Sequence, residues 1–306
     1  MDNARVPEAT FARKCAAWLS DAFAVGGGYP LLLTLTFLME VRWSVASALP
    51  GSDVGALRGL DHVNYLRIAE WLCILDIARG ADWSRTSAGR LERSAGLSLA
   101  IYAGVFVAPT SHYLTALLGM AIAFKAGFIP NLRPLSACLL LVNLQVLPRK
   151  EFYGLSLNEL STALDALGAH YLLLVAGYMN EATGTVIRLQ NSAHAIEIGR
   201  GCATVGPLFE VLAAYGVFAI WLRSHPRRAL FFAGALVIAV VQVNWLRLAV
   251  MAISKPSYDY WHYGPGAPII SFCYTLLAFS FAKMGARATA GGVEAPATES
   301  FPSLFL

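Results

Sequence analysis

Three side chains that could do chemistry together fall near the ends of long apolar stretches in the second half of the chain. Cys202 opens one apolar run, Arg247 lies near the far end of the next, and His262 stands just before the last. If all three runs cross a membrane, the chain reverses direction at each loop, so the three side chains reach the same face. A thiol, a guanidinium and an imidazole gathered there would form a site for nucleophilic catalysis by cysteine.

Two further polar residues could complete such a site. Asn244 lies three residues before Arg247 on the same face of its predicted helix, which indicates a lined cavity rather than a single arginine reaching for the interface. His194 is a rival to His262 as the base, or else a substrate-binding residue. His262 stands among tyrosine and tryptophan residues, so it could also belong to an aromatic belt at the membrane surface.

The position of Cys202 sets it apart from the other cysteines. It follows Gly201 at a predicted helix start, where the helix dipole lowers the pKa of a thiol and favours the thiolate. The remaining cysteines lack the spacing of metal ligands and are expected to pack within helices or in the N-terminal segment; they are Cys15, Cys73, Cys138 and Cys273. We therefore expect neither a metal ion nor a cofactor.

The composition is typical of a membrane protein. The 306 residues are 57% hydrophobic and only 14% charged, too apolar for a soluble globular protein. Long apolar runs in lipid must be helical, so we expect an all-α polytopic membrane protein in contact with the lipid bilayer. The net charge of +4 comes from Lys and Arg clusters at helix ends, which indicates membrane topology and no nucleic-acid partner.

The apolar runs predict about eight transmembrane helices with both termini in the cytoplasm. The arginine-rich loops 79–93 and 223–228 mark the cytoplasmic side, which puts the ends that carry the candidate site on the extracytoplasmic face. This organisation gives a cytoplasmic N-terminal segment 1–21, an integral membrane domain 22–284 and a disordered cytoplasmic tail 285–306. The expected crossings are 28–49, 64–78, 94–108, 111–126, 134–147, 203–222, 229–253 and 267–284.

Two segments between crossings five and six are expected outside the membrane core. The run 157–175 is apolar but interrupted by charges, and counting it as a crossing would reverse the arginine-rich loop; an interfacial or re-entrant helix on the outer face fits better. The run 185–198 alternates with a period of two and predicts a small extracytoplasmic β-hairpin with a two-residue turn at Asn191-Ser192. Within crossing two, Arg67 and Glu70 lie three residues apart on one helix face and could pair.

These residues, taken in their contexts, resemble the exosortase/archaeosortase family. That family is recognised by a cysteine at the start of one membrane helix, an N-x-x-R motif that ends the next, and a histidine that opens the last. The resemblance also includes the eight-crossing layout and the hairpin, and assigns 22–284 to an exosortase-like domain. It is strongest from about Leu139 to Phe281. The matching motifs are Gly201-Cys202, Asn244-Trp-Leu-Arg247 and Trp261-His262-Tyr-Gly264; Ala203-Thr204 stands where the family usually has Ser-Gly.

The resemblance implies a cysteine protease/transpeptidase of the inner (plasma) membrane with its active site on the extracytoplasmic face. Its partners would be membrane-anchored substrate proteins with C-terminal sorting signals, each a short motif, a transmembrane helix and a basic end. Cys202 would form a thioester acyl-enzyme, and His262 would act as acid and base. Arg247 would stabilise the oxyanion or orient the substrate, and Asn244 would orient Arg247 or the substrate backbone.

Two alternatives stay open. The chain could be a non-enzymatic transporter or an assembly factor for polysaccharide export, in which charged residues of crossings one and two line a pathway. Those residues are Glu40, Arg42, Arg67, Glu70 and Asp76. The chain could also be a divergent paralogue that binds sorting signals without cutting them.

Overall fold

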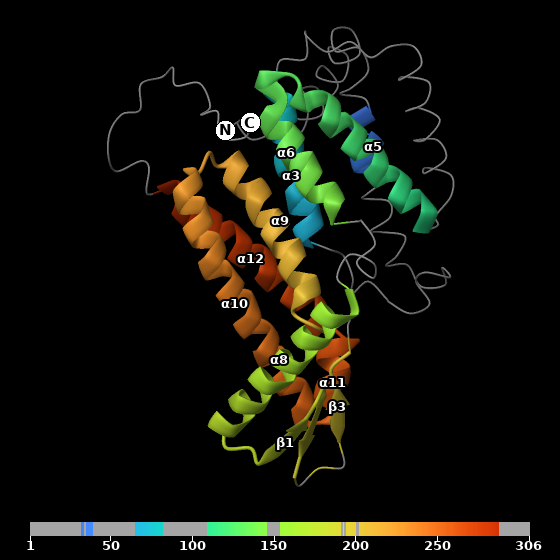
Figure 1. The fold of residues 1–306 in the computed structure, drawn as a ribbon, viewed down its shortest axis with the longest axis vertical. Helices are drawn as coiled ribbons and strands as arrows, with labels where there is room; N and C mark the ends of the chain where they lie inside the picture. The colour runs from blue at the N-terminus through green and yellow to red at the C-terminus, as the bar shows by residue number, and fades with distance from the viewer. Residues whose placement is uncertain are drawn as a thin grey trace, which may run out of the picture.

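The computed structural model is mostly helical, with one small sheet near one end of a helix bundle (Figure 1). It describes residues 32–33, 35–38, 65–81, 109–145, 154–190, 192, 194–199 and 202–287. The expected N-terminal segment 1–21, the third crossing 94–108 and most of the first crossing lie outside these residues. Helices and strands, in chain order, are α3 (Tyr65–Arg79), α5 (Pro109–Gly127), η2 (Pro130–Leu132), α6 (Arg133–Leu144), α8 (Gly154–Val175), β1 (Asn180–Thr183), β2 (Val186–Leu189), β3 (Ala195–Glu197), α9 (Val205–Trp221), α10 (Pro226–Ile253), α11 (Lys255–His262) and α12 (Gly266–Arg287).

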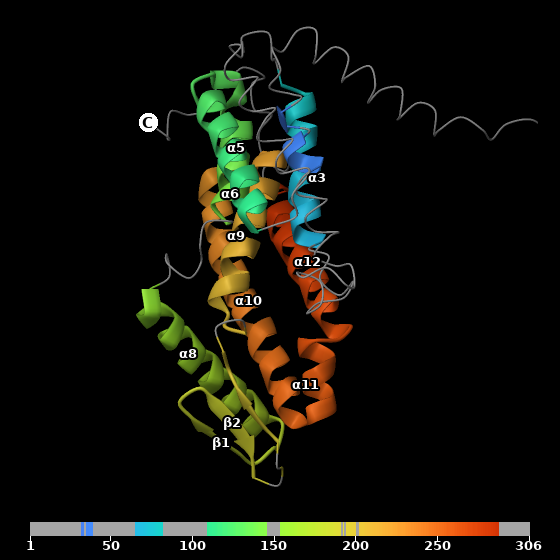
Figure 2. The same ribbon diagram turned by 90° about the vertical axis from the view of Figure 1, so that its right-hand side faces the viewer.

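The bundle is built on α9, α10 and α12, which pack against one another, with α3 and α6 against α9 (Figures 1 and 2). Two helices, Pro226–Ile253 and Gly266–Ala286, are long and apolar enough to cross a membrane by length and composition. Thr115–Gly127 and Val205–Trp221 are shorter apolar helices. The other expected crossings among the described residues, 64–78 and 134–147, correspond to α3 and α6. The number of eight crossings stays a prediction.

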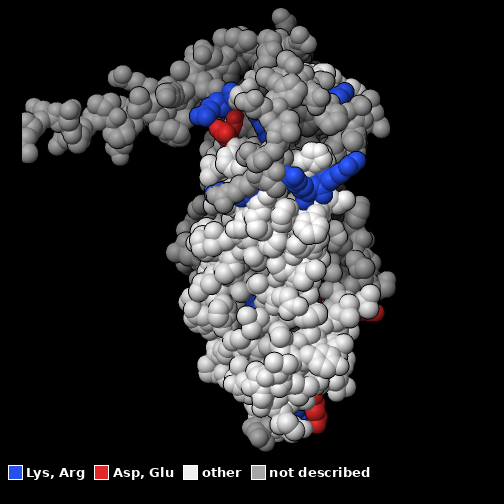
Figure 3. Space-filling model, turned by 90° about the vertical axis from the view of Figure 1, so that its left-hand side faces the viewer, with Lys and Arg blue, Asp and Glu red and all other residues white. Residues whose placement is uncertain are grey.

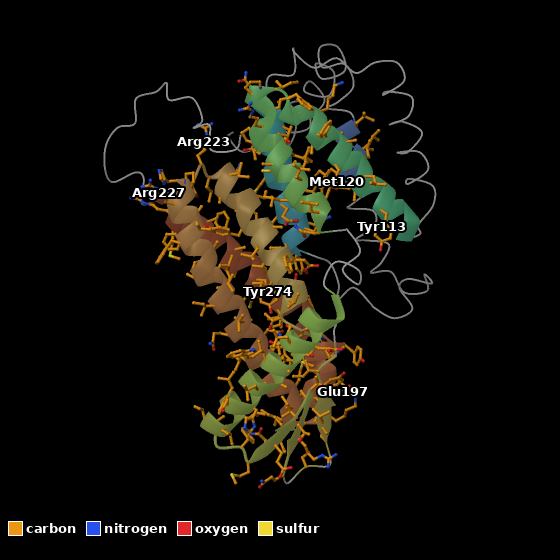
Figure 4. All side chains as sticks on the ribbon, in the orientation of Figure 1. Tyr113, Met120, Glu197, Arg223, Arg227 and Tyr274 are labelled. Carbon is orange, nitrogen blue, oxygen red and sulfur yellow. The ribbon has the colours of Figure 1, made fainter. Side chains whose placement is uncertain are left out.

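Charge distinguishes the two ends of the bundle. Arg223 and Arg227, in and after the turn from α9 to α10, lie at the end opposite Glu197 of β3 (Figure 4). The space-filling view shows most of the visible Lys and Arg toward that same upper end, above a broad surface on which few charged side chains appear (Figure 3). Cys202 precedes α9 and His262 ends α11, so both belong to the end opposite the basic turn. This arrangement is the one expected when basic loops remain on one side of a membrane.

The small sheet has one strand more than the predicted hairpin. β2 and β3 pair antiparallel, as expected, but β1 adds a third strand in the order β1-β2-β3. The tight turn is at Gly184-Thr185, between β1 and β2, where Gly184 takes a φ of 61° that suits glycine. The connection between β2 and β3 is longer than the two-residue turn expected at Asn191-Ser192, because the last paired residues are Arg188 and Ala195.

Helix α8 buries polar side chains on its inner face, beside apolar ones of a hydrophobic cluster, and exposes an apolar stripe on its outer face. Ser161, Thr162 and Asp165 are buried against the rest of the molecule. The exposed side is an apolar stripe at spacings of three and four: Leu160, Leu164, Leu167, Tyr171 and Leu174. α8 packs obliquely on α10 at the end that carries the sheet (Figure 2). An exposed apolar stripe of this kind suits the interfacial helix expected at 157–175.

Two details near the C-terminal part differ from expectation. The segment between the expected crossings 229–253 and 267–284 contains the helix α11. This helix begins after Ser254, whose side chain accepts a hydrogen bond from the Ser257 N–H. An N-cap serine followed by proline in the first turn is a helix-start signal. At the other end, α12 continues to Arg287, past the expected tail boundary at 285, and the rest of the tail lies outside the described residues.

The predicted pairing inside α3 is present. Arg67 Nη1 lies 3.6 Å from Glu70 Oε2, and both side chains are buried. Arg67 Nη1 also donates to the Val142 carbonyl of α6 at 2.5 Å, and Gln145 Nε2 donates to Glu70 Oε1 at 2.8 Å. We call Arg67, Glu70 and Gln145 the Arg67 cluster. It joins α3 to the C-terminal end of α6.

Candidate active site

The thiol of Cys202 and the imidazole of His262 are in direct contact. Sγ lies 3.2 Å from Nε2, although the two residues are 60 positions apart in sequence. Cys202 stands in the turn before α9, and His262 is the last residue of α11. Contact at this distance permits proton transfer between sulfur and nitrogen, which is the geometry of a cysteine nucleophile with its base.

Aromatic neighbours fix the orientation of the His262 ring. Tyr258, one helical turn earlier in α11, stacks on it with 4.9 Å between ring centroids and 29° between planes. Tyr263, the next residue in the chain, has its ring centroid 4.2 Å from that of His262. Gly266 lets α12 start close to α11, because a Cβ there would lie 2.6 Å from Cε3 of Trp261. The imidazole is therefore held by packing as well as by its contact with sulfur.

Arg247 reaches the same place from α10. Its Nε and Nη2 donate to the Trp261 carbonyl oxygen at 3.3 and 3.1 Å, so the guanidinium binds the backbone of the residue just before His262. A cation at the C-terminal end of a helix is also favoured by the helix dipole. Among the residues that the structure describes, Nη1 of Arg247 makes no hydrogen bond. The two N–H groups of Nη1 thus remain to bind an oxygen of a substrate.

Asn244 contacts the backbone of the nucleophile rather than Arg247. Its Nδ2 donates to the Cys202 carbonyl at 3.1 Å and to Thr204 Oγ1 at 2.9 Å. The sequence led us to expect that it would orient Arg247 or bind the substrate backbone. It is fully buried, and its contacts instead tie the turn that carries Cys202 to α10.

His194 lies at the site but in a different contact. Its Nε2 is 3.2 Å from the Met251 carbonyl oxygen, and its ring lies 6.0 Å from that of Tyr258. No contact with Cys202 is found among the described residues. The histidine that the structure brings to the thiol is His262, and His194 stands behind the stacked tyrosine.

Burial sets the protonation of the thiol. Because Cys202 is only 7% exposed, desolvation raises the pKa of its thiol; Arg247 opposes this shift, and Asp165 adds to it. The sequence led us to expect a lowered pKa at a helix start. Cys202 instead lies in a buried turn, three residues before the first residue of α9, and the cost of burying a thiolate is the largest cause of the raised pKa.

The backbone around the nucleophile offers few free donors. The Cys202 N–H donates to the Gly199 carbonyl at 2.9 Å, and the Thr204 N–H donates to Asp165 Oδ2 at 2.7 Å. Amides next to the nucleophile often form the oxyanion hole of acyl-transfer enzymes. Here the amides of Cys202 and Thr204 are already bound within the protein, and the guanidinium of Arg247 is a charged donor at the site.

A residue that sequence reasoning did not select lies beneath the nucleophile. Asp165 of α8 is 2% exposed and accepts hydrogen bonds from the Thr204 N–H, from Thr204 Oγ1 at 2.5 Å and from Trp245 Nε1 at 3.0 Å. We call Asp165, Thr204, Asn244 and Trp245 the Asp165 cluster. The signal in the sequence was a polar stripe on α8, Ser161 and Asp165 four residues apart, facing away from its apolar residues.

Comparison with known families places the chain. Residues 72–279, more than half of its length, match the family model for transmembrane exosortases (Exosortase_EpsH). The chain belongs to the transmembrane exosortase family. The match confirms the resemblance and extends it toward the N-terminus, since the resemblance was strongest only from Leu139. No curated protein and no solved structure matches the chain.

Membership of this exosortase family, together with the apolar helices, establishes a membrane protein. The candidate site falls at the ends of helices that lie within the matched region. In the described part of this exosortase, no group of three or more His, Cys, Asp or Glu side chains could hold a metal ion. The expectation that the reaction needs no metal or cofactor stays a prediction.

Proposed function

We propose that the protein is a cysteine protease/transpeptidase that cleaves C-terminal sorting signals of exported, membrane-anchored proteins. The observation that carries the proposal is the 3.2 Å contact between Cys202 Sγ and His262 Nε2, with Arg247 bound to the adjacent carbonyl. The family match supports the membrane setting. The position of the site opposite the basic turn supports an active site on the extracytoplasmic face of the inner membrane.

The first half-reaction acylates the enzyme. The thiol of Cys202 transfers its proton to Nε2 of His262 as sulfur attacks the scissile carbonyl carbon, forming a C–S bond. The negative charge that develops on the carbonyl oxygen is stabilised by the free N–H groups of Arg247. His262 then donates the proton to the leaving amine, the C–N bond breaks, and a thioester remains on Cys202.

The second half-reaction releases the product. Water or an acceptor amine attacks the thioester carbonyl while His262 takes its proton. The C–S bond then breaks, and His262 returns the proton to sulfur, which restores the thiol. Burial raises the pKa of Cys202, which favours a neutral thiol before attack and gives His262 the role of general base during it. This differs from a resting ion pair, in which the thiolate is already formed before substrate binds.

The observed contacts favour this function over a transporter. Of the charges that could line a pathway, Arg67 and Glu70 are paired in the Arg67 cluster, and Asp76 binds Arg79 and Trp221 at the basic end of the bundle. Glu40 and Arg42 lie outside the described residues. A polysaccharide-export assembly factor would have no need of the Cys202–His262 contact. A paralogue that binds signals without cutting them is separated by experiment alone.

The deciding experiment replaces the nucleophile. Cys202→Ala and Cys202→Ser should leave the amount of membrane-inserted protein near that of the wild type and stop processing of a reporter with a C-terminal sorting signal. Labelling of Cys202 by a membrane-impermeant thiol reagent in intact cells tests the face of the site. Continued processing by Cys202→Ala would exclude the proposed chemistry. A wild-type protein that binds the reporter and does not cut it would be a signal-binding paralogue.

A further inference from the structure

We propose that Asp165 is a positioning residue of the reaction: its carboxylate, through Thr204, fixes the turn that holds Cys202 against His262. The inference rests on the proposed function, because it assigns a role within that chemistry. It stands on the contacts of the Asp165 cluster, which join α8, the nucleophile turn and α10 at one buried point.

Contacts from α8 and α10 hold the nucleophile turn in place. Thr204 lies two residues after Cys202 and is bound by Asp165 through both its N–H, at 2.7 Å, and its hydroxyl, at 2.5 Å. Asn244 adds a bond to the same hydroxyl and another to the Cys202 carbonyl. Movement of this turn by about 1 Å would break the contact between sulfur and imidazole, and misplacement on that scale costs about 10²-fold in rate.

The side chain at position 165 must be a carboxylate because two N–H donors point at its two oxygens. Oδ2 accepts from the Thr204 N–H, and Oδ1 accepts from Trp245 Nε1, and neither of these N–H groups can act as an acceptor. An asparagine in place of Asp165 has only one oxygen, so either orientation of its amide would point an NH₂ group at one of the two donors. Two donors facing each other in a buried site are costly. Only the acid satisfies both.

Close packing of Trp245 on α8 brings the indole to Asp165. Gly168, three residues later on α8, leaves room for the ring of Trp245, because a Cβ at that position would lie 2.1 Å from Cδ2 of the tryptophan. The ring therefore crosses close against α8 and brings its Nε1 to the carboxylate. Trp245 thus joins α8 to the part of α10 that carries two site residues. Asn244 binds the nucleophile turn, and Arg247 binds the carbonyl next to His262.

The experiment uses the full-length protein in native membranes and has two readouts. One is the cleavage rate of a sorting-signal reporter, and the other is the pH midpoint of Cys202 alkylation, with Cys202→Ala as the background for the other cysteines. The charged and titratable groups that face the thiol are His262, Arg247, Asp165 and Tyr258. Because Asp165 raises the pKa of Cys202, removing its charge should move the alkylation midpoint to lower pH.

Asp165→Asn should lower cleavage by about 10²-fold, the scale of a misplaced catalytic group, and should also lower the alkylation midpoint. Thr204→Val should lower cleavage without that shift, since the carboxylate remains, and Thr204→Ser should restore most of the rate. Thr162→Val is the matched control, because it removes a different buried hydroxyl of α8, one that donates to the backbone carbonyl of Glu159. It should leave both readouts at wild-type values.

A double variant separates positioning from a general loss of stability. In Asp165→Asn/Trp245→Phe the indole donor is gone, so the asparagine amide can turn its NH₂ toward the phenylalanine and its oxygen toward the Thr204 N–H. We expect the double variant to cleave faster than Asp165→Asn alone. If the two changes instead reduce cleavage additively, or if Asp165→Asn keeps the wild-type rate and midpoint, the inference is wrong.

Two outcomes distinguish the inference from the function on which it rests. If Cys202→Ala still processes the reporter, the proposed function fails, and the alkylation midpoint of Asp165→Asn continues to test the contact between the carboxylate and the nucleophile turn. If Cys202→Ala stops processing but Asp165→Asn and Thr204→Val do not slow it, the function stands and the inference fails. Should Asp165→Asn not accumulate, Thr204→Val against Thr204→Ser decides the matter.

Discussion

The described part of the chain buries charge in two places, and the two are built differently. In the Arg67 cluster a cation and an anion on one helix pair at 3.6 Å, and the arginine also binds a carbonyl of α6. In the Asp165 cluster a lone carboxylate is surrounded by neutral donors, an amide N–H, a hydroxyl and an indole. The first neutralises its own charge. The second leaves a net negative charge below a thiol.

This difference separates a group that holds helices together from a group that holds a reactive residue. A buried ion pair with both partners present contributes little to stability overall, yet loss of one partner leaves an unpaired charge in an apolar interior. A carboxylate bound only by neutral donors acts on whatever lies nearby, because its charge is not cancelled by a partner. Beside Asp165 that neighbour is Cys202, whose pKa it raises. Changes in the two clusters should therefore affect different measurements.

The largest effect is expected at the histidine that touches the nucleophile. His262→Ala should reduce reporter cleavage by about 10²–10⁴-fold, the usual contribution of general acid–base catalysis, without loss of membrane-inserted protein. His194→Ala is the matched change, since His194 lies behind Tyr258 and its Nε2 contacts the Met251 carbonyl. Its cleavage rate should stay within a few fold of the wild type, and equal losses in both variants would remove the distinction between the two histidines.

In the Arg67 cluster the effect should be on stability. Glu70→Ala leaves the Arg67 guanidinium buried without its carboxylate, which should cost about 3–5 kcal/mol and lower the thermal unfolding temperature in detergent. The double variant Arg67→Met/Glu70→Met removes both charges and should recover most of that loss, because replacing a whole buried pair by apolar side chains is often neutral. In protein that remains folded, the pH midpoint of Cys202 alkylation should be unchanged, and a shifted midpoint would show that the two clusters are coupled.

The elements of the membrane bundle followed from the sequence because their signals are local. Apolar runs and the basic turn predicted α9, α10 and α12 to within a few residues. The Arg67–Glu70 pair was predicted because the two residues lie three positions apart on one helix. Topology predicted that Cys202 and His262 would lie at the same membrane face. The family resemblance then assigned them to one site. The role of either residue in catalysis stays a prediction.

Features that depend on distant partners were missed. Asp165 was taken only as a charge that interrupts an apolar run, because its donors lie 39 and 80 positions away at Thr204 and Trp245. The direction of the Cys202 pKa was wrong for the same reason: the helix start is visible in sequence, whereas burial in the turn depends on α8 and α10 packing over it. Strand β1 was missed because its run NEAT carries no apolar alternation.

Removing Arg247 should shift the thiol in the direction opposite to the change at Asp165. Arg247 lowers the pKa of Cys202 against the raising effect of burial, so Arg247→Gln should move the alkylation midpoint to higher pH, and Arg247→Lys should keep it nearer the wild type. Cleavage by Arg247→Gln should fall by about 10²–10³-fold, the effect of losing one oxyanion donor. A midpoint that moves to lower pH would mean that the guanidinium does not face the thiol.

The smallest effect tests whether burial, and not mere nearness to the site, gives a charge its influence. Lys255 and Asp259 form an ion pair at 2.5 Å on α11, the helix that carries His262, but their side chains are 63% and 50% exposed. Water and salt screen such a pair, and exposed pairs contribute well under about 1 kcal/mol. Lys255→Ala should therefore leave cleavage and the alkylation midpoint at wild-type values. A clear shift in the midpoint would show that an exposed charge on α11 reaches the thiol through solvent. Nearness to the thiol, and not burial alone, would then explain the influence of Asp165.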